Sequence, residues 1–180
     1  MSFKDNFLNR LQNLHLREVQ EFPKSILPGH YRPAAVLLLF WPAEDGRVEV
    51  LLTKRTETVI SHRGETSFPG GGAKSTDNSL QTTALRETRE ETGIDSESIN
   101  IMGRLDDAWS RAGHHVIPFV GWLQKKPEFT PDPREVDEII IADAEMLMQP
   151  DISEEHKVVI NDVTTVTHAF RWEGSGASFN

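Results

Sequence analysis

Three glutamates, at positions 87, 90 and 91, stand close together in the run RETREE at 86–91. In a helix, residues at i, i+3 and i+4 share one face, so a helix here would gather the three carboxylates. Like charges at that spacing weaken a helix by roughly 0.2–0.5 kcal/mol per pair. A cation among the acids offsets that cost, and oxygen-only ligands favour a hard divalent ion such as Mg²⁺ or Mn²⁺. Acidic helix faces are more often simply solvated, but the spacing makes Glu87, Glu90 and Glu91 candidate metal ligands.

The flanking residues indicate where this helix begins and ends. Asn78 or Ser79 can cap its first turn, and Gly93 suits the left-handed conformation that follows a helix. The face expected to pack inward consists of Leu80, Ala84, Leu85 and Thr88. Arg86 precedes Glu90 by four residues and can orient its carboxylate through a charge-assisted hydrogen bond.

Directly before the helix lies the run FPGGG at 68–72, whose missing side chains allow the backbone to approach a ligand closely. From Gly72 to Ile94 the sequence resembles the Nudix box, G-x5-E-x7-R-E-U-x-E-E-x-G-U, in which U is apolar. The matching residues are Gly72, Arg86, Glu87, Glu90, Glu91, Gly93 and Ile94. Two positions differ from the pattern: Asn78 stands where the box has its first glutamate, and Thr88 where it has its first apolar residue.

Further runs resemble the coenzyme A diphosphatase branch of that family. LLTKR at 51–55 and HRGETSFPGG at 62–71 are similar to its LLTxR…GxxxFPGG motif, and the branch tends to have Asp where this chain has Asp77. LDD at 105–107, GHHVIPFVG at 113–121 and EV at 135–136 extend the resemblance, which covers about Ala34 to Ile141. The branch usually carries a later WGxTA run, which this sequence lacks.

The resemblance implies a fold and a reaction. The fold is α/β, a Nudix fold with an α/β/α sandwich around a mixed β-sheet. The reaction is hydrolysis of the pyrophosphate bond of coenzyme A or a derivative, giving 3′,5′-ADP and a phosphopantetheine, with Mg²⁺ or Mn²⁺ as cofactor. Negative charge on both attacker and target hinders this reaction, and divalent ions relieve that hindrance. Glu87 and Glu91 are the expected ligand pair, and Glu90 is a third ligand or a metal-bridged base.

Residues outside the helix complete the expected site. The resemblance implies that the loop carrying Lys54, Arg55, His62 and Arg63 helps to recognise coenzyme A, whose 3′-phosphate such cations can bind. Gly70 and Gly71 are expected to contact the substrate. In this fold a general base often follows the central strands, which makes Glu135 the leading candidate and Glu138 the reserve. The tandem His114 and His115 can titrate near neutrality, although such a pair in a loop more often lies on the surface.

Two alternative functions stay open at this stage. A Nudix hydrolase for another nucleoside diphosphate derivative, such as ADP-ribose, NADH or a nucleoside triphosphate, would share the helix and the metal and differ in the recognition loops. A catalytically silent domain that binds a nucleotide or a partner belongs to another class. The complete set of three glutamates argues against the silent domain.

Composition limits the function classes further. One hundred and eighty residues suit one domain with a real core. The formal net charge of −9 argues against nonspecific nucleic-acid binding and against anionic membranes. The absence of cysteine gives no sign of an oxidising compartment, and no apolar run approaches the roughly 20 residues of a membrane span. We therefore expect a cytoplasmic protein with a small-molecule substrate, and leave open whether it forms a homodimer.

Periodicity and turn residues divide the chain into three parts: 1–33, an N-terminal helix and linker; 34–172, which the resemblance implies is a Nudix hydrolase domain; and 173–180, a flexible tail. Helical segments are expected at Lys4 to Glu21 and, as a turn, at Asp143 to Met148. Strands are expected at Ala34 to Trp41 and Arg47 to Lys54, as a hairpin, and at 99–105, 116–123, 138–141, 158–160 and 163–172. Lys125 to Arg134, with three prolines, is expected to be a loop.

Overall fold

The computed structural model describes residues 2–12, 14, 32–56, 66–110 and 113–149, and the strand backbones of 153–160, 163–171 and 178–179. The helices are α1 (Phe3–Gln12), α2 (Leu80–Thr92) and α3 (Ala144–Leu147), with a 3-10 turn η1 (Ser96–Ser98). The first six strands are β1 (Arg32–Pro42), β2 (Val48–Arg55), β3 (Thr66–Ser67), β4 (Gly70–Gly72), β5 (Asn100–Arg104) and β6 (Ala108–Trp109). The later strands are β7 (His114–Trp122), β8 (Val136–Asp143), β9 (Ser153–Ile160), β10 (Val163–Arg171) and β11 (Ser178–Phe179).

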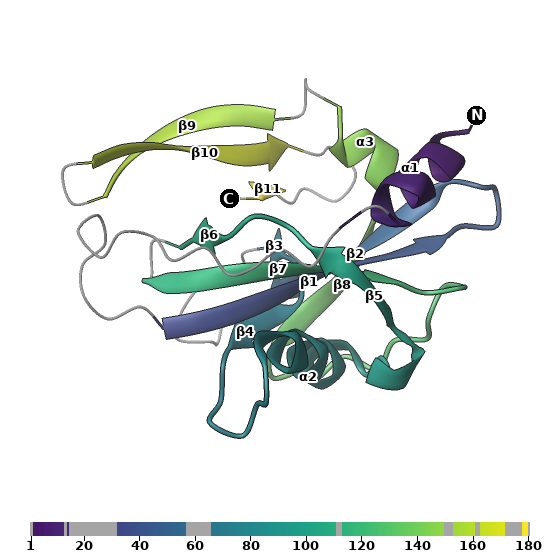
Figure 1. Ribbon diagram of the computed structural model, residues 1–180, viewed down its shortest axis with the longest axis horizontal. Coiled ribbons are helices and arrows are strands. Elements are labelled where there is room, and N and C mark those ends of the chain that lie inside the picture. The colour runs from purple at the N-terminus through teal and green to yellow at the C-terminus, as the bar shows by residue number, and fades with distance from the viewer. Residues whose placement is uncertain are drawn as a thin grey trace.

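Strand β1 is the centre of a mixed sheet (Figure 1). It runs parallel to β7 along its length and antiparallel to β2 and to the glycine strand β4. β8 adds to β2, and β5 and β6 add to β7, all antiparallel. The run AAVLLLFW at 34–41 suits this place, because a strand covered on both faces is apolar at successive positions rather than at alternate ones.

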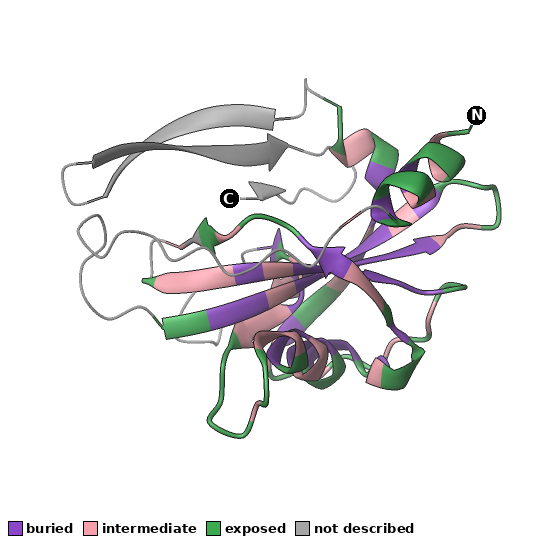
Figure 2. Cartoon of the chain, viewed as in Figure 1, coloured by how far each residue is buried: buried purple, intermediate pink, exposed green. Residues whose placement is uncertain are grey.

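Successive side chains of β1 enter two separate cores, one on each face of the sheet. Leu37, Leu39 and Trp41 pack with Ala84 of α2 on one face. Phe40 packs on the other face, where its ring meets Phe7 of α1 edge-on at a centroid distance of 4.9 Å. Ala144 of α3 belongs to this second core. Figure 2 shows the buried positions along β1 and β7 and on the inner side of α2. Helices therefore cover both faces, as the expected α/β/α arrangement requires.

The expected hairpin, the strand after the acidic helix, the long loop at 125–134 and the helical turn at α3 are all present. β8 is longer than expected, beginning at Val136 rather than Glu138. The short strands β3, β4 and β6 were not expected, because paired glycines and two-residue strands have little propensity of their own. The expected N-terminal helix is present as α1, and the rest of its range lies outside the described residues apart from Leu14.

In the part of the chain that the structure describes, no helix is long and apolar enough to cross a membrane. Of the expected flexible tail, residues 173–177 and 180 lie outside the described residues. Ser178–Phe179 instead forms β11, an extended strand paired with β10. The division of the chain into three parts stays a prediction.

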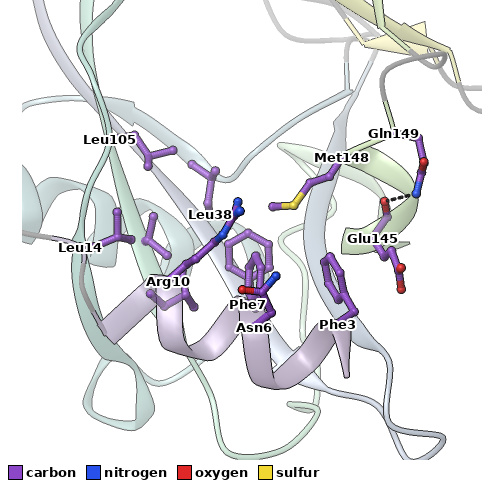
Figure 3. A pocket seen from close by; sticks show the side chains of 13 residues that line it. Phe3, Asn6, Phe7, Arg10, Leu14, Leu38, Leu105, Glu145, Met148 and Gln149 are labelled. Atoms are coloured by element: carbon purple, nitrogen blue, oxygen red, sulfur yellow. Dashed lines mark hydrogen bonds between the residues drawn. The ribbon is translucent and has the colours of Figure 1, made fainter. Parts of the chain in front are cut away.

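A cavity of about 390 Å³ opens on the sheet face opposite α2, between α1 and α3 (Figure 3). Phe7, Leu38 and Met148 contribute to its apolar wall, and Arg10 extends over it. None of the acids of α2 lines this cavity. The chemistry expected from the sequence therefore lies on the other face of the sheet.

Candidate active site

Helix α2 has the ends that the sequence indicates. Ser79 is the N-cap, and its Oγ accepts a hydrogen bond of 3.1 Å from the backbone N–H of Thr82. Gly93 follows the last turn with φ of 78°, and its N–H donates to the carbonyl of Arg89. Thr88, which replaces an apolar residue of the box, is fully buried, and its hydroxyl donates to the carbonyl of Ala84 at 2.8 Å. That bond satisfies the hydroxyl inside the helix, so a threonine fits the inward face.

Glu91 is the most buried of the three acids, at 2% exposed. Its carboxylate faces β4, where the N–H of Gly70 donates to Oε2 at 3.3 Å. On its other oxygen Arg55 donates from Nη1 at 3.2 Å. Burial raises the pKa of Glu91 to about 7, and the charges of Glu87 and Glu135 raise it too, whereas Arg55 and the Gly70 N–H lower it. Burial thus outweighs the contacts with Arg55 and the Gly70 N–H that favour the charged form of Glu91.

Glu87, one turn earlier, is also nearly buried and lies against the glycine strand. A Cβ added at Gly71 would lie 2.7 Å from the carboxyl carbon of Glu87. Gly70 has φ of 158°, and a Cβ there would come within 2.4 Å of the carbonyl oxygen of Ala35. The glycines therefore allow close approach between β4, β1 and the acids of α2. Substrate contact at Gly70 and Gly71 stays a prediction.

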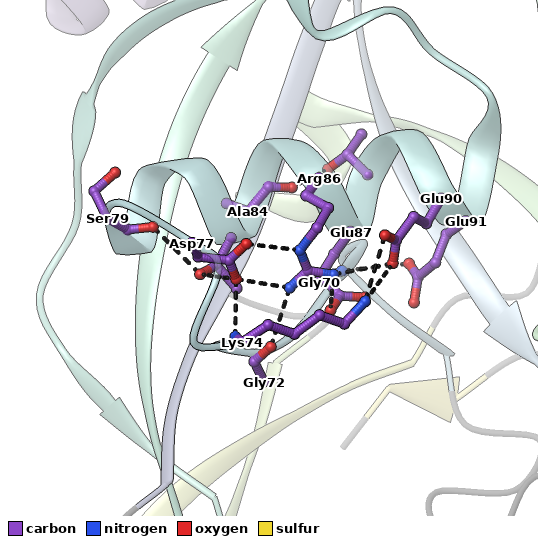
Figure 4. Close-up of polar contacts among 12 residues, drawn as sticks. Gly70, Gly72, Lys74, Asp77, Ser79, Ala84, Arg86, Glu87, Glu90 and Glu91 are labelled. Carbon is purple, nitrogen blue, oxygen red and sulfur yellow. Dashed lines mark hydrogen bonds and ion pairs between the residues drawn. The ribbon is translucent and has the colours of Figure 1, made fainter.

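Arg86 joins the acids to the loop before the helix (Figure 4). Its Nη1 donates to Glu87 Oε1 at 2.6 Å and to Glu90 Oε2 at 2.9 Å, so the expected Arg86–Glu90 contact is present. Its Nη2 reaches the carbonyl of Gly72 at 3.2 Å. One guanidinium thereby fixes two carboxylates of α2 relative to the glycine strand.

Asp77 holds the other edge of this guanidinium, a role that the sequence analysis did not assign. Its two oxygens accept from Nε and Nη2 of Arg86, both at 2.9 Å, and Thr83 Oγ1 donates to the same carboxylate. These bonds from Arg86 hold the pKa of Asp77 well below its usual range. The only sequence signal was the resemblance that pairs Asp77 with the Asp of the coenzyme A branch.

Glu90 departs from the expected cluster. Its side chain is 45% exposed and turns to Lys74, whose Nζ lies 3.0 Å from Oε2. Burial by itself would raise the pKa of Glu90, but its contacts with Lys74 and Arg86 lower it below the ordinary value. The sequence analysis missed Lys74 because spacing alone does not show where a loop lysine points.

The donor set suits a hard divalent ion, although the three acids do not converge as a group. Within the described ranges, no three acidic or histidine side chains stand close enough together to form a metal site as they are. Each acid instead faces a cation of the protein: Arg55 at Glu91, Arg86 at Glu87, and both Arg86 and Lys74 at Glu90. Carboxylate oxygens are the ligands that Mg²⁺ and Mn²⁺ prefer, and in this structure they pair with arginine and lysine instead. The ligand set Glu87, Glu90 and Glu91 stays a prediction.

The other expected site residues fall into three groups. Glu135 is half-buried and near enough for its charge to act on Glu91, whereas Glu138 is exposed on β8. Lys54 pairs with Asp137 at 3.6 Å instead of facing the acids of α2. His62 and Arg63 lie outside the described residues. Among the described residues, Arg55 is the only expected substrate-binding cation that contacts an acid of α2.

The histidine pair begins strand β7 rather than lying in a loop as expected, and both residues are half-buried. His115 Nε2 lies 2.6 Å from Asp107 Oδ2, and Arg104 forms an ion pair with the other oxygen of Asp107. Asp107 and Arg104 are almost completely buried. Burial lowers the pKa of His115, and the charge of Arg104 lowers it further. The three side chains, from β5, β7 and the turn between β5 and β6, form a polar cluster that the sequence analysis did not foresee.

Comparison with known proteins agrees with this geometry. The family model described as "NUDIX domain" matches residues 30–163. Nudix hydrolase 22, chloroplastic, of Arabidopsis thaliana is 39% identical over 132 residues, which are 71% of this chain and 44% of that protein. A protein of Pectobacterium atrosepticum called "Uncharacterized Nudix hydrolase NudL" is 38% identical over 122 residues, 66% of this chain and 62% of its own length.

Solved structures share the fold. The Nudix hydrolase RenU of M. smegmatis superposes with a TM-score of 0.55 at 21% identity, covering 64% of this chain and 73% of that one. The acidic helix, the glycine strand and the mixed sheet therefore define a Nudix domain. The chain belongs to the Nudix family, and it spans roughly half the length of the plant relatives that it matches.

Proposed function

We propose that this protein hydrolyses the pyrophosphate bond of a nucleoside diphosphate derivative, with coenzyme A or one of its derivatives as the substrate. The observation that carries the reaction is the arrangement on α2, where buried Glu87 and Glu91 stand one turn apart and face a strand of three glycines. Glu87 is joined to that strand through Arg86, and Glu91 through the N–H of Gly70. The names of the relatives support hydrolysis by a Nudix enzyme. The choice of coenzyme A rests on the runs at 51–55 and 62–71 that resemble the diphosphatase branch.

A divalent ion held by Glu87 and Glu91, with Glu90 as a third ligand, would neutralise phosphate oxygens and lower the pKa of a bound water. The protein's own groups do the positioning. Arg86 orients Glu87 and Glu90, and the glycines leave room beside them because no Cβ projects there. Glu135, beside Glu91, is the residue proposed to accept a proton from the attacking water. Products would be 3′,5′-ADP and a phosphopantetheine.

A screen of substrates tests the proposal. Coenzyme A, ADP-ribose, NADH and deoxynucleoside triphosphates are incubated with Mg²⁺ or Mn²⁺, and the products are separated by chromatography. We expect release of 3′,5′-ADP from coenzyme A with the highest kcat/KM of the set. A higher value for ADP-ribose or NADH would favour the second hydrolase reading, because the acids of α2 would serve both. Failure to cleave any of them would favour a silent nucleotide-binding domain.

Dephospho-coenzyme A tests the substrate choice separately. It lacks the 3′-phosphate, which Arg55, His62 or Arg63 is proposed to bind by charge-assisted hydrogen bonds worth about 1.5–3 kcal/mol. We therefore expect a loss of about tenfold or more in kcat/KM relative to coenzyme A. Equal kcat/KM for the two compounds would remove the 3′-phosphate from the recognition model while leaving the hydrolytic chemistry in place.

A further inference from the structure

Lys74 lies in the loop between β4 and α2, at the edge of the acid cluster (Figure 4). Its ammonium contacts both oxygens of Glu90, at 3.0 and 3.4 Å. Its backbone N–H donates to Asp77 Oδ2 at 2.9 Å. The backbone of this residue is therefore fastened to the same carboxylate that holds Arg86, while its long side chain reaches back over the site.

The three cations at the acids are held very differently. Arg86 is 18% exposed and bonds to Asp77, Glu87, Glu90 and a backbone carbonyl, so moving it would break many bonds. Arg55 is 25% exposed and pairs with the buried Glu91. Lys74 is 54% exposed, and in the described part of the chain Glu90 is the one acid that pairs with its ammonium. Lys74 is thus the cation that can leave with the least loss.

The energy of this pair is small enough for exchange. Exposed ion pairs contribute about 0.2–1 kcal/mol, and a lysine ammonium is a point charge on a flexible stem. Two events would draw it away from Glu90. A divalent ion competes for the same carboxylate oxygens, and a bound diphosphate offers oxygens that carry more negative charge than one carboxylate.

We propose that Lys74 is a substrate-binding residue that pairs with Glu90 while the site is empty and transfers to the phosphates of the bound nucleotide. This inference rests on the proposed function and adds a residue to it. Two opposite effects follow from the exchange. Without substrate, Lys74 opposes divalent-ion binding at Glu90; with substrate, it strengthens binding of the diphosphate.

Two titrations of the same variants measure these effects. In calorimetry with Mn²⁺ alone, Lys74→Met should bind the ion about 1.4- to fivefold more tightly than the wild type, because an exposed competitor worth about 0.2–1 kcal/mol is removed. In calorimetry with α,β-methylene-ADP at saturating Mn²⁺, the same variant should bind the nucleotide about tenfold or more weakly, because a charge-assisted contact is lost. Lys74→Arg keeps the charge and should stay near the wild type in both titrations.

Lys125→Met is the matched control, because Lys125 is an exposed lysine in the loop after β7. It should change neither titration. Opposite shifts in Lys74→Met cannot arise from a damaged fold, which would weaken both ligands. Weakening of both, or unchanged binding of the nucleotide, would overturn the role of Lys74. The two ideas fail separately: if wild-type protein hydrolyses none of the screened compounds, the proposed function fails, whereas an active wild type with an unaltered Lys74→Met refutes this inference alone.

Discussion

Replacing Glu91 with Gln should make the metal-free protein more stable at neutral and alkaline pH. The carboxyl is 2% exposed, and its pKa is raised from 4.5 to about 7, chiefly by burial. Between pH 4.5 and about 7, the native state therefore keeps a proton on Glu91 that the unfolded chain has released. Stability from this group is complete below pH 4.5 and is lost as the pH rises towards 7, because folding must then bury a charge.

The size of the effect follows from the same pKa values. A rise from 4.5 to about 7, at about 1.4 kcal/mol for each pH unit, corresponds to about 3 kcal/mol once both states are ionised. Gln has nearly the same shape and no charge, so the variant does not lose this stability as the pH rises. Part of the gain is offset because Arg55 loses its charged partner. We expect the unfolding free energy of the variant to exceed that of the wild type by about 1–3 kcal/mol at pH 8.

Urea unfolding in EDTA at half-unit steps from pH 4.5 to 8 measures this difference. The unfolding free energies of wild type and variant should diverge as the pH rises. Replacing EDTA with Mn²⁺ should reduce the divergence by stabilising the ionised carboxylate of the wild type. Glu128→Gln, at an exposed position in the loop after β7, is the control and should run parallel to the wild type. Parallel curves for Glu91→Gln would show that burial does not penalise this charge, and the electrostatic account of the site would be wrong.

Three substitutions test other parts of the site. Asp77→Asn should lower kcat about tenfold or more with little change in KM, because Arg86, which fixes Glu87 and Glu90, loses a charged partner. Asp77→Glu should restore part of the rate. Equal kinetics for the wild type and both variants would show that Asp77 has no positioning role. Gly71→Ala should abolish most turnover, since its Cβ would displace the carboxylate of Glu87. Gly72→Ala should stay active, because a Cβ there meets open space. Comparable rates for the two variants would contradict the close contact between Gly71 and Glu87. Glu135→Gln should depress kcat by about 10²-fold, more than it raises KM, and a wild-type rate would place the general base elsewhere.

The acidic helix could be predicted from local sequence because its signals are local. A capping serine, a glycine after the last turn and acids at i, i+3 and i+4 each act within a few residues. The central strand was also predictable, since a run of apolar residues without breaks fits a strand buried on both faces. The α/β/α sandwich was expected from the resemblance of these runs to the Nudix family, and the comparison with Nudix structures agrees with it.

The contacts that complete the site were not predictable, because they join residues far apart in the sequence. Arg55 and Glu91 meet only after α2 has packed on the sheet that contains β2. Lys54, the neighbour of Arg55, pairs with Asp137 instead, and the β2–β8 register shifts between Lys54 and Arg55. Glu90 matched the box as well as its neighbours did, yet it lies on the outer edge of the face and meets Lys74. Helical spacing identifies a shared face, but it does not identify which of its members converge.

Because β1 sends alternate side chains into two cores, the two sides of this molecule can change independently. Phe40 packs against Phe7 of α1, whereas Leu37 and Leu39 pack with Ala84 of α2 on the opposite face of the sheet. A substitution that loosens α1 should lower the melting temperature and leave nucleotide affinity unchanged. The face around α1 should therefore accept new surface groups, such as a tag for immobilisation or a fused reporter, without altering the acids of α2 that are proposed to support turnover.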